Sequence, residues 1–550
     1  MLNSFYLKRV LTLLAISYVF FFLGNSLLSL TDPDEVFYAL TAKEMAANGQ
    51  WLTPYIFDHP QFEKPIFLYW LLLPAFDQWG ITPFSARFFP ALFASLGVLA
   101  VYGLGLLGFK NERRAFWSAV VLCSAGLYVG MGKTLFTDTI FSVFILCALL
   151  SFYCAFAIDR RKTFGILAFF TFAALATLTK GPLGLLLPAL TIVLFLLYRR
   201  RLDFLANWWV LAGFGVFLAV ALPWYAFMFK TYGHDFTHEF FYNDHLRRLL
   251  SAEHKGNDRF YFYPFTMLLG LFPWTLFLAA ALFEVFKKLK TGVSEFEHFL
   301  LSWILVVFFI FQCSHSKLAS YILPLFPALA LLTGQFIEEA FDSAKGRLLK
   351  AFLVIMAAFW AILGIAVVVA YPVYKTYLSS IEPVFFLSAC LIAFAGGLVA
   401  LVLKERLALA TGLLCGGLLP FLWTAFLIKA DIQPYFCTHD ASMYLPHYSG
   451  TKTTILSSKP YARGVRYYTG QEVAVLDING KNYFSPHPVT ILSTQEQLIA
   501  FLQQQKLTYA LVKKGGYKAI TELSPSEFTV HVHKKLGYTY IVSIESLPSS

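Results

Sequence analysis

The 550-residue chain is 58% hydrophobic and only 14% charged, whereas soluble domains carry about 25% charged residues. This composition excludes an ordinary soluble protein and predicts a polytopic α-helical membrane protein. The formal net charge of +11 does not indicate nucleic-acid binding, because most Lys and Arg residues lie in short clusters between apolar runs.

About thirteen apolar runs are long enough to cross a bilayer, which takes ~20 residues each. They lie near residues 10–30, 84–107, 115–132, 139–158, 163–179, 183–198, 207–229, 264–285, 298–313, 318–337, 350–371, 383–403 and 407–428. We interpret the first run as a span and not as a cleavable signal peptide, because it is too long and no small-residue cleavage site follows it.

Seven basic clusters separate these runs in a regular way. They are Lys8-Arg9, Lys110 to Arg114, Arg160 to Lys162, Arg199 to Arg201, Lys287 to Lys290, Lys345 to Lys350 and Lys404 to Arg406. Each falls in an even-numbered connection when the N-terminus is counted as zero. The positive-inside rule therefore predicts that these connections face the cytoplasm and that the odd ones lie outside.

The two long outer connections cover residues 31–83 and 230–263, and a tail of different character follows the last span. The tail contains strand-like runs ("TKTTILSS", "EVAVLDI", "PVTILS", "YALVKK") and a helical segment, "TQEQLIAFLQQQ". We therefore expect a transmembrane domain over residues 1–429 and a small outer α/β domain over 430–550. Six of the seven cysteines lie in or beside apolar runs, which predicts neither a disulfide framework nor a Cys-rich metal site.

Acidic residues follow the first span directly, in "TDPDEVFYA". Acids at the membrane surface are costly unless they are solvated, paired or bound to a ligand. Asp34 and Glu35 can be first-turn acids of a short interfacial helix. Asp34 can equally act as a general base or hold a metal. The spacing alone leaves both interpretations open.

Two further polar groups precede apolar segments. Lys64, in "FEKP", stands before an aromatic helix, where a lysine can bind a lipid phosphate or extend to the headgroups by snorkelling. Asp138, in "KTLFTDTIF", begins the fourth span, where helix capping is the alternative to a functional role.

The remaining polar groups lie in two later outer segments. "YNDHLRR" places His245 and Arg248 beside Asp244, a set that can ligate a metal, bind an anion or form a solvated loop. In "SHSKLASYILPLFPALALL", Lys317 and Tyr321 are four residues apart, and we expect them to share one helix face. All of these groups map to the same side of the membrane, which suits a charged, lipid-linked substrate.

These motifs also carry a family resemblance. "DPDEVFYA", "FEKP", "TD" at the fourth span, "HLRR" and "SKLASYILPLFPALALL" resemble the GT-C membrane glycosyltransferases, and among them the bacterial ArnT-like aminoarabinose transferases. The resemblance covers roughly the first 340 residues and the general layout of the chain. It implies transfer of 4-amino-4-deoxy-L-arabinose from undecaprenyl phosphate to lipid A. It also implies a periplasmic site on the bacterial inner membrane, inversion at the sugar carbon and a part in polymyxin resistance.

The resemblance further implies roles for individual residues. Asp34 would be the principal catalytic carboxylate and Asp138 a second important acid, while the donor phosphate would be held by Lys64 and Tyr321 with added charge from Lys317 and Arg248. Glu63 and His245 match positions that can bind a divalent metal, Zn or Mg/Mn. One departure concerns Phe37, which stands where the family pattern Asp-Glu-x-Arg-Tyr has its arginine.

Three alternatives stay open at this stage. A protein O-mannosyltransferase or another lipid-linked-sugar transferase would share most of these residues. A transporter or flippase predicts internal repeats and polar, broken helices at mid-membrane, whereas the acids here lie mostly at span ends. A structural or receptor-like protein predicts that changes at Asp34, Lys64 or Asp138 leave function intact.

Overall fold

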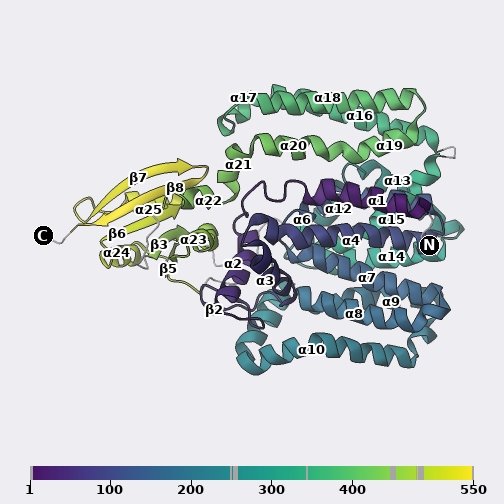
Figure 1. Ribbon diagram of the computed structural model, residues 1–550, viewed down its shortest axis with the longest axis horizontal. Coiled ribbons are helices and arrows are strands. Elements are labelled where there is room, and N and C mark those ends of the chain that lie inside the picture. Colours follow the sequence, from purple (N-terminus) through teal and green to yellow (C-terminus); the bar gives the residue numbers. More distant parts are fainter. Residues whose placement is uncertain are drawn as a thin grey trace.

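The computed structural model describes residues 4–247, 250–251, 258–341, 345–445, 454–478, 480 and 488–547. These residues form a bundle of long helices and a smaller domain with a sheet, which lies beyond one end of the bundle (Figure 1). The N-terminus lies at the opposite end of the bundle. Polytopic helical architecture with a C-terminal α/β unit is therefore confirmed.

Every predicted apolar run forms helix. In chain order these are α1 (Ser4–Ser17) with the π-helical turn η1 (Tyr18–Phe22), α4 (Pro83–Phe109), α5 (Glu112–Cys123), α6 (Gly126–Gly132), α7 (Thr137–Ala157), α8 (Lys162–Lys180), α9 (Leu183–Arg199), α10 (Trp208–Thr237), α12 (Phe262–Gly270), α13 (Thr275–Thr291), α14 (Glu295–Gln312), the 3-10 helix η5 (Ala319–Leu325) with α15 (Phe326–Phe341), α16 (Gly346–Val369), α18 (Glu382–Leu403), α19 (Leu407–Cys415) and α20 (Leu419–Leu427).

The predicted number of thirteen spans is not confirmed. Within the described residues, nine helices are long and apolar enough to cross a membrane, and eleven if each of two bent pairs counts as one span. The other two predicted runs correspond to α1 with η1 and to α9, which has only 17 residues. An α-helix rises about 1.5 Å per residue. These segments are therefore short for a helix that crosses a bilayer, which takes ~20 residues.

The two bent pairs meet at their breaks. The pair α5–α6 bends by 63° and the pair α12–α13 by 115°. At the junction the backbone N–H of Gly126 donates to the carbonyl of Phe272 (2.9 Å), and the Trp274 indole donates to Ser124 Oγ (2.9 Å). Backbone groups at a helix break inside an apolar bundle need hydrogen-bond partners from elsewhere. Here the Gly126 N–H at one break and the Phe272 carbonyl at the other are partners of each other.

Ion pairs tie the basic clusters together at one end of the bundle. Arg9 pairs with Glu112, and Arg199 with Glu295. Further contacts link the remaining clusters: Arg113 with Glu338, Arg114 with Glu339, Lys162 with the Phe204 ring, Lys288 with Glu297, Lys345 with Glu284, and Lys350 with Glu405. All seven predicted cytoplasmic connections therefore lie together, as the positive-inside rule predicted.

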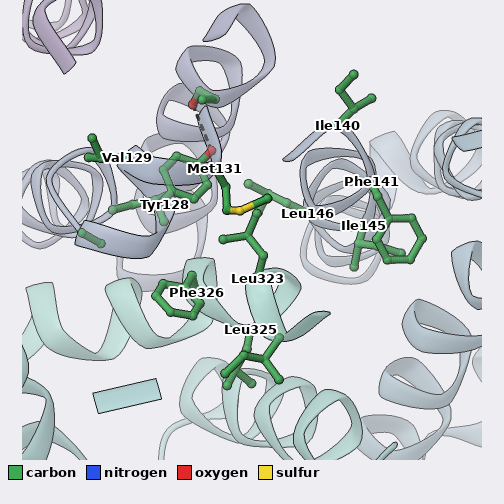
Figure 2. Close-up of a cluster of buried hydrophobic side chains, with 14 of the residues drawn as sticks. Tyr128, Val129, Met131, Ile140, Phe141, Ile145, Leu146, Leu323, Leu325 and Phe326 are labelled. Atoms are coloured by element: carbon green, nitrogen blue, oxygen red, sulfur yellow. Dashed lines mark hydrogen bonds between the residues drawn. The ribbon is translucent and has the colours of Figure 1, made fainter. Parts of the chain in front are cut away.

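At the end of the bundle away from the basic clusters, an apolar core holds the helices against one another. Figure 2 shows Tyr128 and Met131 of α6, Phe141 of α7, Leu323 of η5 and Phe326 of α15 packed together, all of them buried. Close packing of this kind leaves little freedom for sliding. The start of α7 is consequently held against η5, and these two elements carry Asp138 and Tyr321.

Two shorter helices lie between the bundle and the C-terminal domain (Figure 1). They are α2 (Asp34–Ala47) and α3 (Phe67–Trp79), and the loop between them contains the short strands β1 (Tyr55–Ile56) and β2 (His59–Pro60). The helix expected after "FEKP" is α3, so that prediction is confirmed.

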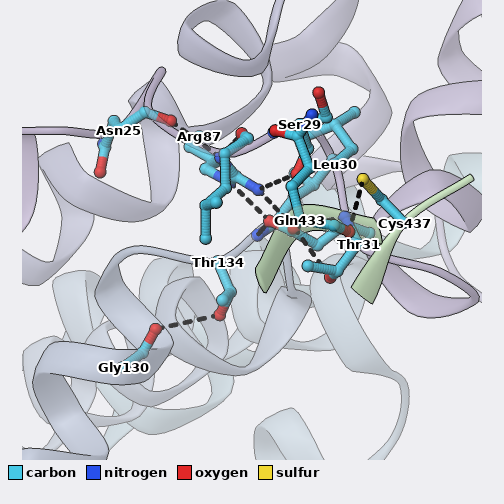
Figure 3. Close-up of polar contacts among 12 residues, drawn as sticks. Asn25, Ser29, Leu30, Thr31, Arg87, Gly130, Thr134, Gln433 and Cys437 are labelled. Atoms are coloured by element: carbon cyan, nitrogen blue, oxygen red, sulfur yellow. Dashed lines mark hydrogen bonds and ion pairs between the residues drawn. The ribbon is translucent and has the colours of Figure 1, made fainter. Parts of the chain in front are cut away.

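A buried ion pair anchors the start of α2. Glu35 is fully buried and accepts hydrogen bonds from Arg87 Nε (2.7 Å) and Arg87 Nη2 (2.6 Å). The backbone N–H groups of Thr31 and Leu135 also donate to this carboxylate, at 2.9 and 2.8 Å. Arg87 in turn donates to three carbonyls of residues 25–29, and Figure 3 shows this side chain among them. Burial alone would raise the pKa of Glu35, but these bonds and the Arg87 charge hold it below its usual value.

The C-terminal domain is built on a six-stranded sheet with strand order β5-β4-β3-β6-β8-β7. Its strands are β3 (Thr454–Ser458), β4 (Glu472–Leu476), β5 (Ile491–Leu492), β6 (Leu507–Val512), β7 (Phe528–Leu536) and β8 (Thr539–Ser546). The helices α23 (Ala462–Thr469), α24 (Gln495–Gln503) and α25 (Lys514–Thr521) connect them. The first four strands and α24 match the predicted segments, whereas the antiparallel hairpin β7–β8 was not predicted.

Helix α23 docks this domain onto α2. Arg466 pairs with Glu44 (2.9 Å) and Asp58 (2.5 Å), and Lys43 Nζ donates to the carbonyl of Tyr467 (2.6 Å). The fit leaves no room at Gly464, where an added Cβ would lie 2.2 Å from Asp32 Oδ1 and 2.1 Å from Thr438 Oγ1. The domain is therefore attached through specific polar contacts in addition to the chain itself.

We predict that Arg87→Ala destabilises the folded chain by about 3–5 kcal/mol, because it leaves the Glu35 carboxylate buried without its partner. Thermal unfolding of the detergent-purified chain measures this effect. The matched control is Arg113→Ala, which removes an ion pair of 3.6 Å whose arginine side chain is 66% exposed. Equal melting temperatures for the two variants would contradict the prediction.

Candidate active site at the outer end of the bundle

Asp34 begins α2 and is exposed, whereas the adjacent Glu35 is buried in its ion pair. The two acids therefore have different tasks, and Glu35 is structural. One turn further, Tyr38 is buried, and burial together with the nearby charges of Asp138 and Asp34 raises its pKa well above the usual value. Tyr38 is thus a neutral hydroxyl close enough to both Asp34 and Asp138 for their charges to act on it.

Asp138 lies at the start of α7 and forms an ion pair of 2.5 Å with Lys180, the last residue of α8. Both side chains are largely buried, at 5% and 15% exposure. Lys180 Nζ also lies 4.5 Å from the centre of the Tyr321 ring. Sequence analysis selected Asp138 and Tyr321 but missed Lys180, which joins them.

Lys64 forms a second lysine–carboxylate pair, 2.9 Å from Asp244 Oδ2. Its loop is held by Phe62, whose ring lies 5.1 Å from that of Tyr232 on α10. Asp244 reaches this position because α10 turns at Gly233, with φ 50° and ψ −118°, into the π-helical segment η4 (His238–Arg247). Only glycine adopts such a conformation without strain.

The charges of Lys64 and Asp244 both act on Lys180. The two lysine–carboxylate pairs therefore lie close to one another. Each ammonium group has three N–H donors, and the Asp138 bond uses one of those of Lys180. In this arrangement each lysine charge is balanced by an aspartate, and N–H donors remain that can bind an anionic ligand.

Lys317 is buried, and its Nζ donates to the carbonyl of Asp258 (2.9 Å). The expectation that Lys317 and Tyr321 share one face of an α-helix is wrong. Lys317 precedes the helix, and Tyr321 lies within the 3-10 helix η5, since Pro324 cannot donate the backbone bond of an α-helical turn. Lys317 approaches the Tyr263 ring instead, 6.0 Å from its centre.

Arg248, predicted to add positive charge at the donor phosphate, lies outside the described residues. Of the two predicted metal ligands, Glu63 and His245, the side chain of His245 is not among those described. Glu63 Oε1 lies 3.7 Å from Nη2 of Arg463, a residue of α23. Among the described residues no three His, Cys, Asp or Glu side chains gather as a metal site. The metal at Glu63 and His245 stays a prediction.

Sequence reasoning missed three residues of this cluster, Lys180, Asp244 as the partner of Lys64, and Arg463. A signal existed for Lys180, because it is a lone cation in an odd-numbered, outer connection, against the general pattern. No signal existed for Arg463, because its neighbours Phe37 and Glu63 are about 400 residues away along the chain.

Asp32 lies beside this cluster, where the C-terminal domain docks. Its Oδ2 accepts hydrogen bonds from the backbone N–H of Thr438 (2.7 Å) and from the Thr438 hydroxyl (2.9 Å). Burial raises the pKa of Asp32 to about 7, although the Thr438 bonds and the Arg463 charge oppose this rise.

Comparison with known proteins gives a consistent result for the sequence. A family model described as dolichyl-phosphate-mannose-protein mannosyltransferase matches residues 6–237. A Proteus mirabilis protein named undecaprenyl phosphate-alpha-4-amino-4-deoxy-L-arabinose arabinosyl transferase 2 is 30% identical over 68% of this chain and 69% of its own length. Transferases of the same name from Pectobacterium carotovorum and Shewanella sediminis are 31% and 33% identical, and the chain matches 64% and 63% of their lengths.

Solved structures agree with the fold. The crystal structure of ArnT from Cupriavidus metallidurans bound to undecaprenyl phosphate superposes with a TM-score of 0.77, covering 99% of this chain and 98% of that one at 19% identity. The Archaeoglobus fulgidus oligosaccharyltransferase superposes with a TM-score of 0.51 over 96% of this chain and 70% of its own, at 14% identity. The predicted GT-C fold is therefore confirmed.

We predict that Asp32 makes the stability of the folded chain depend on pH. Its folded pKa of about 7 lies above the usual 3.8, so the folded state binds the proton more tightly than the unfolded state. The contribution of Asp32 is therefore most favourable below pH 4 and declines as the pH rises to about 7.

Asp32→Asn removes this titration, so the variant should gain stability relative to wild type between pH 5 and pH 8, measured as the difference in melting temperature. Asp77→Asn, at an exposed acid on α3, is the matched control and should show no such trend. A constant difference between wild type and Asp32→Asn across this range would refute the assignment.

Proposed function

The chain belongs to the family of the undecaprenyl phosphate-4-amino-4-deoxy-L-arabinose arabinosyl transferases, and on that premise we propose that it is a glycosyltransferase of this specificity. The sugar moves from undecaprenyl phosphate to a phosphate of lipid A at the periplasmic face of the bacterial inner membrane. The observation that carries this proposal is the meeting of two lysine–carboxylate pairs, Lys64–Asp244 and Asp138–Lys180, at the outer end of the bundle.

Lysines at this depth suit the phosphate of a lipid-linked donor. An ionised side chain inside an apolar bundle is costly and needs a partner, and each lysine here has one. When a phosphate binds, its oxygens accept hydrogen bonds from the remaining N–H donors of Lys180 and Lys64. The Tyr321 ring lies against the Lys180 ammonium group. Lys317, buried beside the Tyr263 ring, is a third positive charge at the outer end of the bundle.

The reaction is a single displacement at the anomeric carbon. An oxygen of the acceptor phosphate forms the new bond to this carbon, while the bond to the donor phosphate oxygen breaks and its electron pair leaves with undecaprenyl phosphate. Fixed positive groups that stabilise charge developing on a leaving group lower the barrier by several kcal/mol, typically about 3–4 for one donor. The configuration at the sugar carbon is thereby inverted.

Asp34 is assigned to the reacting sugar and acceptor. A phosphate acceptor is already an anion, so Asp34 does not need to remove its proton and instead orients the sugar, with Tyr38 as a neutral hydrogen-bond donor behind it. If the acceptor is a hydroxyl group, the exposed carboxylate of Asp34 serves as the general base.

A divalent metal held by Glu63 and His245 remains a separate proposal, and no step above is routed through it. Glu63 faces the Arg463 guanidinium, so a cation bound there shares its carboxylate with another positive group. Metal analysis of the purified chain, followed by chelation and return of Zn²⁺, Mg²⁺ or Mn²⁺, decides whether activity depends on one.

The match to a mannosyltransferase family model favours a second candidate, transfer of mannose from a polyprenyl phosphate to protein. The two candidates share the displacement and differ in sugar and acceptor. The transporter alternative loses support, because the residues at the two helix breaks, 124–125 and 271–274, include no ionisable side chain.

We predict that the wild-type chain, expressed in a bacterium lacking its own aminoarabinose transferase, adds a pentosamine mass to lipid A, read by mass spectrometry. Asp34→Asn should abolish this gain because the carboxylate that orients the sugar is lost. Asp77→Asn is the control, since this acid lies exposed on α3. All three proteins must reach equal levels in the membrane.

The outcomes separate the parts of the proposal. A hexose gain on protein in place of lipid A would favour the mannosyltransferase candidate. An active Asp34→Asn protein would refute the role of Asp34.

We further predict that Lys64→Gln raises the KM for the donor by about ten- to a hundredfold, the range expected for one lost charge-assisted hydrogen bond. Lys64→Gln also removes the ion pair with Asp244, so the double variant Lys64→Gln/Asp244→Asn is measured beside it. Steady-state kinetics should show the same high KM in both. Recovery of the wild-type KM in the double variant would show that Lys64 serves only to neutralise Asp244.

A further inference from the structure

Arg463 projects from the C-terminal domain toward the candidate site. It is the second residue of α23, and its guanidinium carbon lies 4.4 Å from the centre of the Phe37 ring on α2. Nη2 is 3.7 Å from Glu63 Oε1, and Glu63 is the neighbour of Lys64. This arginine therefore reaches the same loop that presents the Lys64–Asp244 pair.

The hydrogen-bonding capacity of Arg463 is not used up by these contacts. A distance of 3.7 Å to Glu63 is an ion pair but too long for a hydrogen bond. Its buried Nε has no acceptor among the described residues. The side chain is nevertheless only 13% exposed. A buried donor without an acceptor is costly, which indicates that a ligand oxygen completes the site.

Arg466, one turn along the same helix, serves as a comparison, because its contacts hold the C-terminal domain against the bundle. It pairs with Glu44 at 2.9 Å and with Asp58 at 2.5 Å, both within hydrogen-bond distance. Two carboxylates are sufficient to hold this side chain in place. The two arginines of α23 thus differ, because Arg466 is satisfied within the protein and Arg463 is not.

We propose that Arg463 is a phosphate-binding residue of the transfer site, supplied by the C-terminal domain. Its guanidinium lies over the Phe37 ring, and the planar N–H edge of a guanidinium matches two oxygens of a phosphate group. It provides a cation beside Phe37, where α2 itself has only an aromatic ring. The inference rests on the proposed function, and the phosphate belongs either to undecaprenyl phosphate or to lipid A.

A consequence concerns the C-terminal domain as a whole. Since α23 is fixed on α2 by Arg466 and Lys43, Arg463 enters the site only while the domain is docked. The domain is then part of the active enzyme and not merely an appended unit.

The test uses the full chain purified in detergent, with Arg463→Gln, Arg463→Lys and the control Lys518→Gln, at a lysine of α25 that is 78% exposed. Binding of undecaprenyl phosphate is measured by titration, and the KM values for sugar donor and lipid A are measured separately. We expect Arg463→Gln to weaken one phosphate-bearing ligand by about ten- to a hundredfold. Arg463→Lys, which keeps the charge, should fall between this variant and wild type.

The ligand that weakens identifies the source of the phosphate. Loss of undecaprenyl phosphate binding with a raised donor KM assigns Arg463 to the donor, whereas a raised lipid A KM alone assigns it to the acceptor. Unchanged values for both ligands in Arg463→Gln overturn the inference. A loss in Arg463→Lys equal to that in Arg463→Gln, or an equal loss in Lys518→Gln, also overturns it, because neither the charge nor the position of Arg463 would then matter.

The proposed function fails in a different way. If the wild-type chain transfers no pentosamine to lipid A, that proposal is refuted, while the titration with undecaprenyl phosphate still compares the variants of Arg463.

Discussion

The buried ion pair between Glu35 and Arg87 organises the outer end of this molecule. One arginine on α4 holds the carboxylate that begins α2 and three carbonyls of the preceding loop, and the same carboxylate accepts the amide of Leu135 just before α7. Glu35 therefore sets the positions of Asp34 and Asp138 relative to each other. Because such a pair is stabilising only when all its donors and acceptors are satisfied, its geometry admits little variation.

The lysines of the site obey the same requirement that a buried charge be paired. In an apolar bundle a lone ammonium or carboxylate is expensive, and Lys64 and Lys180 each lie beside an aspartate. Pairing offsets the cost of burying these charges, and each ammonium group has N–H donors beyond the one in its ion pair. For the proposed lipid-phosphate donor, positive groups would then already be in position, without the cost of ordering flexible side chains.

Much of this arrangement was predictable from the sequence. The helices and the end of the bundle at which the basic clusters meet follow from local patterns. The candidates Asp34, Asp138, Lys64 and Tyr321 were also selected from the sequence, and their roles stay predictions. The shared helix face of Lys317 and Tyr321 was not correctly predicted, because Pro324 favours a 3-10 helix over an α-helix. The number of spans was also uncertain, because two runs are divided by bends and two others form helices that are short for a span.

The sequence by itself determined the membrane architecture, because burying twenty apolar residues and placing basic clusters on one side are local requirements that each segment meets on its own. Only the tertiary structure decided which charges face each other. The pairs Lys180–Asp138, Lys64–Asp244 and Arg463–Glu63 join residues that are 42, 180 and 400 positions apart. No periodicity encodes such contacts, since they arise from how helices and domains pack, and the chemistry of the site depends on them.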